Sequence, residues 1–461
     1  MFKNILKSEF SRNVMTLLTG SAFAQLIPLL LMPVISRLFS PEEFGLFAFY
    51  FSLVSFFLVI SSGRYEMAIL LPKKDKDAIN VLALAFSILV GVSLILLLAL
   101  LFFEKNIQEI IDKPELNDWL LLIPLCVFVT SGHKIFTYWS NRKKRFKNTS
   151  LSIVTQSTSR SAVLFFGGLM KNDFFTGTET KTGFFKAIFK KDFVVSSGIT
   201  PLGIGSFILS YVIGFSLSFF YLLVGFLRND RELLKEIKKD RIKFLAKKHE
   251  KFPKINSLHA LADELKNSGV TFVISYLFND VILGFYSMTF RVLRAPLSVI
   301  GNSFSQVFLQ KAAEMHAHNQ DFVPLIKKTV KKLALIALPI FIPIVFFGPQ
   351  LFSFVLGDKW EIAGQYAQYL TPWLFLNFAI SPILQVALVL DKQKEIFGFA
   401  LVGNLIIFIS IFIGGYFFND IIKGFILLSI LQLFYYFFVY KWVLKISQPM
   451  SRKPDSQNHP I

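Results

Sequence analysis

Positively charged side chains lie deep inside the apolar stretches of this sequence. Arg291 and Arg294 follow Gly284 by seven and ten residues, and Arg160 and Lys266 lie near the centres of two other apolar stretches. The three-residue spacing of Arg291 and Arg294 places both guanidinium groups on one face of a helix. Guanidinium groups form paired hydrogen bonds with phosphate or carboxylate. These four residues therefore predict a binding site for an anionic substrate.

Acidic residues accompany these cations. Asp263 and Glu264 lie in the same stretch as Lys266, and Glu66 follows an earlier stretch. An acidic group inside a membrane can carry a coupling proton or Na⁺, or it can neutralise a neighbouring cation in a structural ion pair. The sequence leaves both readings open. It predicts no metal site and no cofactor.

Two lysines and a proline complete the set of unusual intramembrane residues. Lys134 and Lys423 lie close to the ends of their stretches, so we expect their amines to extend to the membrane surface. Pro296 comes two residues after Arg294. A proline removes a helix hydrogen bond and favours a kink, which makes Pro296 a hinge candidate.

The elements that must position these residues are membrane-spanning helices. Of the 461 residues, 54% are hydrophobic and 55 are Phe, and the mean hydropathy is +0.56. A helix of about 20 apolar residues crosses about 30 Å of hydrocarbon and satisfies its own backbone polar groups there. Twelve such helices are expected, at 13–35, 44–63, 78–102, 119–140, 151–170, 199–227, 256–278, 283–309, 333–356, 362–390, 396–417 and 421–440.

Two of the twelve stretches, 151–170 and 256–278, are the least apolar. A helix with so many polar residues is unfavourable against lipid, so we expect both to line a hydrated cavity. The charges inside the stretches are mostly basic, which predicts a cationic cavity.

The distribution of charge along the chain predicts its orientation. There are 49 Lys and Arg against 30 Asp and Glu, a net charge of +19. Most of this surplus falls in alternate loops, which the positive-inside rule places in the cytoplasm together with both termini. The surplus therefore reflects membrane orientation and contact with anionic lipid, and it gives no support for nucleic acid binding.

Signatures of catalysis are weak in this sequence. The single cysteine, Cys126, excludes a disulfide framework and a cysteine-based metal site. The sequence lacks the phosphate-binding loop of an ATPase. Asp75 and Asp77 have the spacing of the metal-binding carboxylates of glycosyltransferases, but they lie in a short loop between two stretches. We therefore do not expect an enzyme.

An internal repeat relates the two halves of the chain. Residues 34–45 align with 273–284 at a shift of 239, and six of the twelve positions are identical. A shift of six spans preserves orientation, which predicts two parallel six-helix lobes around a central cavity. We place the lobes at 1–227 and 256–461. The basic segment 228–255 between them is read either as an interfacial amphipathic helix or as a solvated linker.

Several motifs resemble those of a known membrane protein family. They are GRYEMAILLP at 63–72, GFYSM at 284–288 followed by Arg291, Arg294 and Pro296, and GNSFSQ at 301–306 followed by KAAE at 311–314. With them the sequence resembles the polysaccharide-biosynthesis (O-antigen) flippases of the multidrug/oligosaccharidyl-lipid/polysaccharide exporter superfamily. The resemblance covers essentially the whole chain and is strongest in 30–75 and 252–320.

This resemblance implies an all-α protein of the bacterial cytoplasmic membrane, with about twelve helices in two pseudo-symmetric lobes around a cationic cavity. It implies movement of undecaprenyl-diphosphate-linked oligosaccharides from the inner to the outer leaflet, for O-antigen or capsule. Arg291, Arg294, Arg160 and Lys266 would then hold the head group, and Arg64 would guard the entrance. A polysaccharide polymerase and glycosyltransferases are the implied protein partners.

Two other functions remain as alternatives. A drug or cation antiporter of the same superfamily would be expected to have an acidic cavity for cationic drugs. An integral membrane polysaccharide polymerase or ligase would be expected to carry catalytic residues in a large outer loop, and only 171–198 has the length. That loop is also longer than the connection that the family resemblance implies.

Overall fold

The computed structural model describes residues 9–171, 201–318 and 320–448. All regular secondary structure in these residues is helical, with no β-strand among them. The all-α class predicted from the sequence is therefore confirmed. The loop predicted at 171–198 lies outside the described residues except for Lys171, the last residue of its helix.

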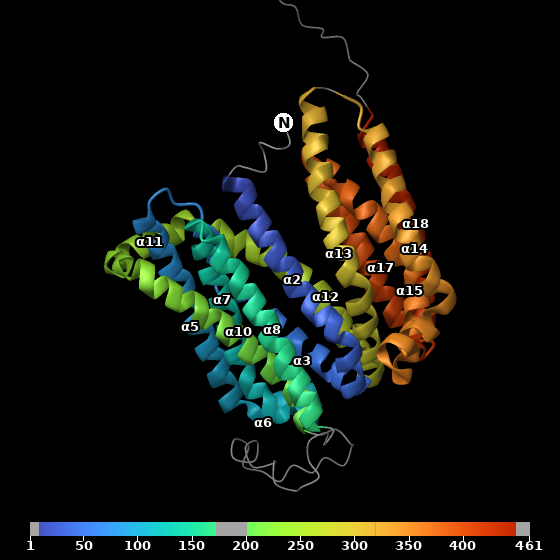
Figure 1. Cartoon of the computed structure of the whole chain (residues 1–461), viewed down its shortest axis with the longest axis horizontal. Coiled ribbons are helices and arrows are strands. Elements are labelled where there is room, and N and C mark those ends of the chain that lie inside the picture. Colours follow the sequence, from blue (N-terminus) through green and yellow to red (C-terminus); the bar gives the residue numbers. More distant parts are fainter. Residues whose placement is uncertain (1–8, 172–200, 319, 449–461) are drawn as a thin grey trace, which may run out of the picture. The chain divides into compact units, whose positions relative to one another are not determined.

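Twelve long helices dominate the described part of the chain, and each of them overlaps one predicted span. They are α2 (Glu9–Leu38), α3 (Pro41–Ile60), α5 (Asp75–Phe102), α7 (Ile123–Arg142), α8 (Phe146–Lys171), α10 (Pro201–Asp230), α12 (Ser257–Leu277), α13 (Asp280–Ala317), α14 (Val323–Leu356), α15 (Glu361–Ile380), α17 (Gln393–Tyr416) and α18 (Ile421–Ile446). Their order is shown by the colours in Figure 1. The predicted span 362–390 is interrupted after α15, because a 3₁₀ turn containing Pro382 intervenes at η5 (Ser381–Gln385).

Shorter elements join the long helices. They are α4 (Tyr65–Ala68), α6 (Glu104–Ile111), η1 (Pro114–Leu122), η2 (Arg231–Glu236), α11 (Lys239–Lys248), η3 (Phe252–Asn256), η4 (Asp358–Trp360) and α16 (Val386–Val389). The basic segment 228–255 is thus largely helical. It combines a 3₁₀ turn, a ten-residue α-helix and a π-helical turn.

Nine of the helical segments in the described residues are long and apolar enough to cross a membrane. The helices α8, α12 and α13 are not among them. These are the helices that carry Arg160, Lys266 and the pair Arg291 and Arg294. A helix that spans a membrane with such charges must turn them away from lipid, so the three less apolar helices are the ones expected to face water.

The helix ends support the internal repeat. The shift of 239 that aligns 34–45 with 273–284 also carries the end of α2, Leu38, to the end of α12, Leu277. The same shift carries the start of α3, Pro41, to the start of α13, Asp280. The two hairpins therefore break at equivalent positions, as expected for a duplicated unit.

The chain forms two compact units. The first contains Met1–Ser275 with Asp280–Gly284, and the second contains Tyr276–Asn279 with Phe285–Ile461. The helix α12 and the first residues of α13 therefore group with the first unit. The lobes predicted at 1–227 and 256–461 and the linker predicted at 228–255 remain a prediction about the repeat.

The core of the first unit is built from aromatic contacts between α3 and α10. Figure 1 shows α2, α8, α10 and α7 side by side in this unit. Phe207 of α10 lies at the centre, with its ring centroid 4.7 Å from that of Phe39, 4.8 Å from Phe44 and 5.0 Å from Phe47. These tilted, edge-on and stacked aromatic pairs add to the stability gained from burial.

The second unit packs through small residues and polar contacts between helices. A Cβ atom at Gly348 of α14 would collide with the backbone of Gly364 of α15, so these helices approach at glycine. The hydroxyl of Thr289 donates to the carbonyl of Ala363 over 2.8 Å. Close approach at glycine and hydrogen bonds between helices are typical of membrane proteins, because apolar side chains gain little from leaving lipid.

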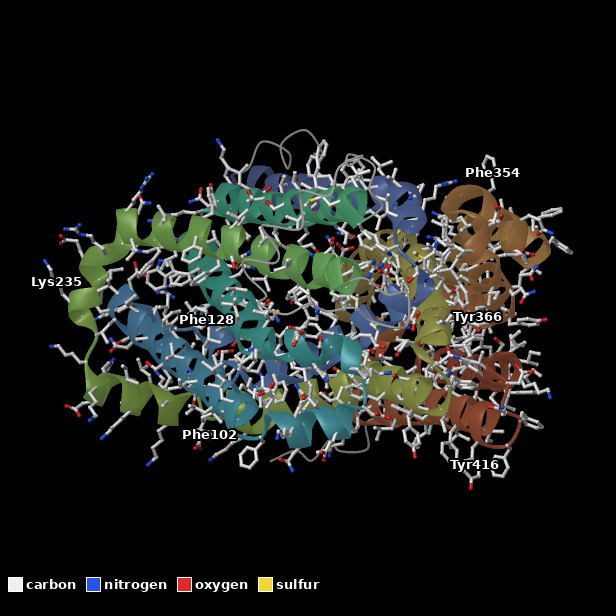
Figure 2. The ribbon with its side chains drawn as sticks, turned by 90° about the horizontal axis from the view of Figure 1, so that it is seen from below. Phe102, Phe128, Lys235, Phe354, Tyr366 and Tyr416 are labelled. Carbon is white, nitrogen blue, oxygen red and sulfur yellow. The ribbon has the colours of Figure 1, made fainter. Side chains whose placement is uncertain are left out.

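The outer surfaces of both units carry large apolar side chains. Phe102 is 78% exposed, Phe354 81% and Tyr416 67%, and Figure 2 shows all three pointing away from the ribbon. Such surfaces are unfavourable in water and are expected of helices that face lipid. Together with the nine apolar segments in the described residues, they show a multi-pass membrane protein.

Candidate functional site

A cavity of about 280 Å³ lies within the first unit. Its walls are formed by α3, the turn that follows α3, α7, α10 and α12. The lining residues are Phe51, Ser55, Leu58, Val59, Arg64, Thr130, Lys134, Tyr211, Phe215 and Glu264. Aromatic and aliphatic walls with a few charged groups are typical of a ligand-binding site.

Arg64 reaches the cavity from a strained turn. Gly63 and Arg64 both have positive φ angles, 57° and 59°, a conformation that is unfavourable for residues other than glycine. The turn brings the buried carboxylate of Glu66 within 2.5 Å of the Ser62 hydroxyl and 3.9 Å of the Arg64 guanidinium. Nε of Arg64 is buried, and no hydrogen-bond partner for it lies among the described residues.

Lys134 supplies the second cation of the cavity. It extends from the middle of α7, four residues after Thr130, which also lines the cavity. Within the part of the chain that the structure describes, no carboxylate lies within ion-pair distance of its amine. Lys134 is exposed and lines this cavity, and the expectation that its amine extends to the membrane surface stays a prediction.

Arg160 lies behind the aromatic wall. Its guanidinium is 5.1 Å from the ring centroid of Tyr211 and 6.0 Å from that of Phe215. Gly214 leaves room for this side chain, since a Cβ atom there would overlap Cγ of Arg160 and lie 2.9 Å from the carbonyl oxygen of Gln156. Cation–π contact orients a guanidinium without neutralising its charge. Arg160 therefore adds positive potential to the cavity through Tyr211 and Phe215.

The acidic candidates of α12 divide between two environments. Glu264 lines the cavity, and the Ser268 hydroxyl lies 2.6 Å from its carboxylate and 3.3 Å from the carbonyl oxygen of Ser52. Asp263 is exposed, and Lys266 is not among the lining residues. The cavity therefore contains two cations, Arg64 and Lys134, and one carboxylate.

The remaining sequence candidates lie in the second unit. Arg291 and Arg294 are three residues apart on α13 and both are exposed. The guanidinium of Arg294 lies 4.6 Å from the ring centroid of Phe290. Helix α13 is continuous through position 296, and the side chain of Pro296 lies outside the described residues. The roles of these three residues stay predictions.

Of the lining residues, sequence reasoning assigned only Arg64 and Glu264 to a site and did not assign others such as Lys134, Tyr211 and Phe215. The signal for the two aromatic residues lay in their four-residue spacing on α10, which places both rings on one helix face. In an apolar helix with many Phe residues that pattern is common, so it does not distinguish a cavity wall from a core.

The described residues contain no group of three His, Cys, Asp or Glu side chains that could hold a metal ion. The chemistry of the cavity is instead that of charge recognition. Two cations in a partly apolar cavity favour a ligand with an anionic group and a non-polar or ring-shaped surface.

Comparison with known proteins decides the family. Residues 34–170 and 192–365 match the family described as polysaccharide biosynthesis protein. The chain belongs to this family. The resemblance found in the motifs at 63–72 and 284–296 is thereby confirmed. No curated protein matches the sequence.

Solved structures share the fold at low sequence identity. An inward-facing multidrug resistance MATE family transporter of the MOP superfamily matches with a TM-score of 0.65 and 11% identity over 94% of both chains. The lipid II flippase MurJ, in an inward closed conformation, matches with a TM-score of 0.60 and 14% identity over 94% of this chain and 89% of its own. The Vibrio cholerae MATE transporter VcmN matches with a TM-score of 0.55 and 12% identity, covering 94% and 96%. This polysaccharide biosynthesis protein thus has the fold of the MOP superfamily transporters.

Proposed function

We propose that this protein is a flippase that moves undecaprenyl-diphosphate-linked oligosaccharide repeat units from the inner to the outer leaflet of the bacterial cytoplasmic membrane. Surface polysaccharide, O-antigen or capsule, would be the end product. The observation that carries the proposal is the cationic cavity of the first unit, with Arg64 and Lys134 in its walls. The family and the fold of transporters support it.

The cavity offers separate surfaces to the two parts of such a head group. Arg64 and Lys134 bind the diphosphate, because multiply charged oxygens match one guanidinium and one ammonium. Sugar rings lie against Tyr211, Phe215 and Phe51, whose rings form the apolar wall. The polyprenyl chain stays in the lipid throughout, so its apolar surface is never exposed to water.

The remaining candidate cations act along the path of the head group. Arg291, Arg294 and Lys266 receive it as the two lobes alternate between inward-open and outward-open states, with Pro296 as a hinge. Both termini and the basic loops lie in the cytoplasm in this scheme. Outward movement of two uncompensated negative charges gains about 4.6 kcal/mol per 100 mV of inside-negative potential.

Coupling to an ion gradient involves the carboxylates near the cavity. Glu66 and Glu264 lie beside its two cations, and Asp263 lies one residue earlier on α12. Protonation or Na⁺ binding at these groups changes how strongly Arg64 and Lys134 attract the substrate. Polysaccharide polymerase and glycosyltransferases are the expected partners on the two sides of the membrane.

A drug or cation antiporter is the weaker candidate function. Its substrate would carry positive charge, and the cavity is lined by Arg64 and Lys134 with the carboxylate of Glu264, while Glu66 lies 3.9 Å from Arg64. These two cations would repel a positively charged substrate, because charges interact strongly in a low-dielectric site. The cavity therefore favours an anionic substrate.

The proposal is tested by the double variant Arg291→Ala, Arg294→Ala in a strain that needs the flippase for its surface polysaccharide. We expect loss of surface polysaccharide and build-up of the lipid-linked precursor in the inner leaflet. The matched control is Lys327→Ala, Lys328→Ala, which removes two exposed cations from the start of α14. Normal surface polysaccharide with no precursor build-up in the Arg291→Ala, Arg294→Ala variant would overturn the proposed substrate.

A further inference from the structure

The basic segment between α10 and α12 is held firmly against the first unit. The guanidinium of Arg241 on α11 donates two hydrogen bonds to Asp77 at the start of α5, over 2.7 and 2.9 Å. The amine of Lys76 lies 2.7 Å from the carboxylate of Glu236. The side chain of Asn80 donates to the Glu236 carbonyl over 3.0 Å and accepts from the Lys238 backbone N–H over 2.8 Å. The segment is therefore docked on α5.

One face of α11 is covered by this docking. Leu245 is only 2% exposed, and the hydroxyl of Tyr65 donates to the carbonyl of Ala246 over 3.0 Å. Burial of the Tyr65 side chain raises the pKa of its phenol, so the phenol stays protonated as the hydrogen-bond donor. The contacts of Leu245 and Ala246 fix which way the opposite face of α11 points.

That opposite face carries Lys239, Lys243 and Lys247, which we call the lysine stripe. The three residues are four apart, so they lie on one line along the helix, and all three are exposed. Of the described acidic residues around them, Glu236 pairs with Lys76 and Glu250 with Lys254, while Asp240 is exposed between Lys239 and Arg241. No described carboxylate lies within ion-pair distance of the lysine stripe.

The position of α11 along α5 sets its depth relative to the membrane. Arg241 binds Asp77, which directly precedes the apolar residues 78–102 of α5. Figure 1 shows α11 beside the same end of α5. Phe244, next to the lysine stripe, is 54% exposed with its ring 5.0 Å from the Arg241 guanidinium. We therefore expect helix α11 to lie at the edge of the bilayer, with an aromatic ring and three lysines uncovered.

We propose that the lysine stripe is a docking surface for the phosphate groups of anionic lipids in the leaflet beside it. Lysines near a membrane surface attract anionic lipid, each by about 1 kcal/mol, and three together set a preference on the order of a hundredfold. Phe244 inserts at the level of the head groups, as apolar residues of interfacial helices do. Because α11 is tied to Asp77, this contact anchors the cytoplasmic end of α5 to the leaflet.

The test uses a fluorescent label beside the lysine stripe. Asp240 is exposed and lies between Lys239 and Arg241, and the native Cys126 is fully buried, so a maleimide dye reacts at position 240 in an Asp240→Cys variant. The full chain is placed in vesicles that contain spin-labelled lipid as a quencher. One set is phosphatidylcholine, and in the other a third of the lipid is phosphatidylglycerol.

We expect stronger quenching in the phosphatidylglycerol vesicles. The difference disappears in about 1 M salt, where charges are screened beyond about 3 Å. It also disappears in the Lys239→Gln, Lys243→Gln, Lys247→Gln variant. The control variant Lys327→Gln, Lys328→Gln, Lys331→Gln loses the same charge from the start of α14 and keeps the difference. Adding inorganic phosphate to phosphatidylcholine vesicles does not reproduce the effect.

Equal quenching in the two kinds of vesicle would overturn the proposal. If the lysine stripe variant then still lost surface polysaccharide in cells, the stripe would be assigned to an acidic protein partner instead. Equal loss of the difference in the stripe variant and in the α14 control would also contradict it, because the effect would then come from total charge. The quenching results do not depend on what the protein transports.

Discussion

Gly45 of α3 lies against the first residue of α13, and Gly284 of α13 lies against the first residue of α3. A Cβ atom at Gly45 of α3 would overlap the carbonyl oxygen of Asp280, which begins α13. A Cβ atom at Gly284 of α13 would overlap the carbonyl oxygen of Pro41, which begins α3. The two glycines are equivalent in the internal repeat, as are Pro41 and Asp280.

Such a reciprocal contact is what a two-fold relationship between repeats produces. In an isologous contact residue i meets residue j of the partner and residue j meets residue i. Here the partners are two segments of one chain, 41–45 and 280–284, and both belong to the first unit. The ion pair between Lys113 and Asp280, with 2.7 Å between nitrogen and oxygen, ties the start of α13 to the loop before α7.

The glycine contact predicts that both positions are sensitive to a single methyl group. Gly45→Ala and Gly284→Ala each place a Cβ against backbone that cannot swing away, and we expect a loss of about 1–3 kcal/mol. Gly91→Ala on α5 is the matched control, because no atom lies within 4 Å of the added Cβ. Thermal unfolding of the purified protein in detergent measures the effect. Equal melting temperatures for Gly45→Ala and Gly91→Ala would refute the close contact.

Gly214→Ala should displace Arg160 from the aromatic wall. The added Cβ competes with Cγ of Arg160 for the same space, and loss of the contact with Tyr211 removes about 0.5–2 kcal/mol. We expect affinity for a polyprenyl diphosphate lipid to fall by roughly tenfold. Gly225→Ala on the same helix has its nearest neighbour 3.9 Å from the added Cβ and should bind like the wild type. Equal affinity for the two variants would show that Arg160 does not contribute.

Arg64 has both a strained backbone and a positive charge. Two substitutions distinguish the effect of the strain on stability from the effect of the charge on transport. Arg64→Gly relieves the left-handed conformation and should raise the free energy of unfolding by about 1 kcal/mol, while transport is lost with the guanidinium. Arg64→Gln keeps the strain and also loses transport. Thermal unfolding and precursor build-up in cells are measured together. A Gly variant that still transports would mean that the guanidinium is unnecessary.

The contact between Asp77 and Arg241 should control how readily a protease cleaves the segment 228–255. Asp77→Arg places two guanidinium groups together, so α11 should leave α5 and trypsin should cut the segment several-fold faster. The double variant Asp77→Arg, Arg241→Asp restores opposite charges and should restore slow cleavage. Exposed ion pairs contribute at most about 1 kcal/mol, so we expect little change in melting temperature. Fast cleavage in the double variant would mean that other contacts hold α11.

The positions of the helices follow closely from hydropathy, since the bilayer sets their length and apolar composition. The depth of single residues follows less well. The span predicted at 119–140 placed Lys134 near its end, whereas α7 begins at Ile123 and continues to Arg142. Because α7 begins four residues later and ends two residues later than predicted, Lys134 lies nearer the middle of the helix than of the predicted span. Polar residues near a helix end do not reveal where that end lies, because they are favourable both in a cavity and in water.

Ion pairs between residues far apart in the chain also cannot be predicted from the sequence. The sequence indicates only a loop motif at Asp75 and Asp77, whereas the structure pairs them with Arg142 and Arg241, which lie 67 and 164 residues away. Which side chains pair depends on how the helices pack, and this packing cannot be derived from a single sequence. The internal repeat is the feature of the sequence that relates distant segments, because it aligns 34–45 with 273–284.

The central claim is that the cationic cavity of the first unit carries a diphosphate-linked lipid across the membrane. The most direct measurement uses the purified protein in vesicles with a fluorescent polyprenyl-diphosphate oligosaccharide, whose movement between leaflets is followed by a membrane-impermeant quencher. The wild type should speed this movement, and Arg64→Gln, Lys134→Gln should abolish the increase, while Lys327→Gln, Lys328→Gln should keep it. An Arg64→Gln, Lys134→Gln variant that moves the lipid as fast as the wild type would contradict the claim.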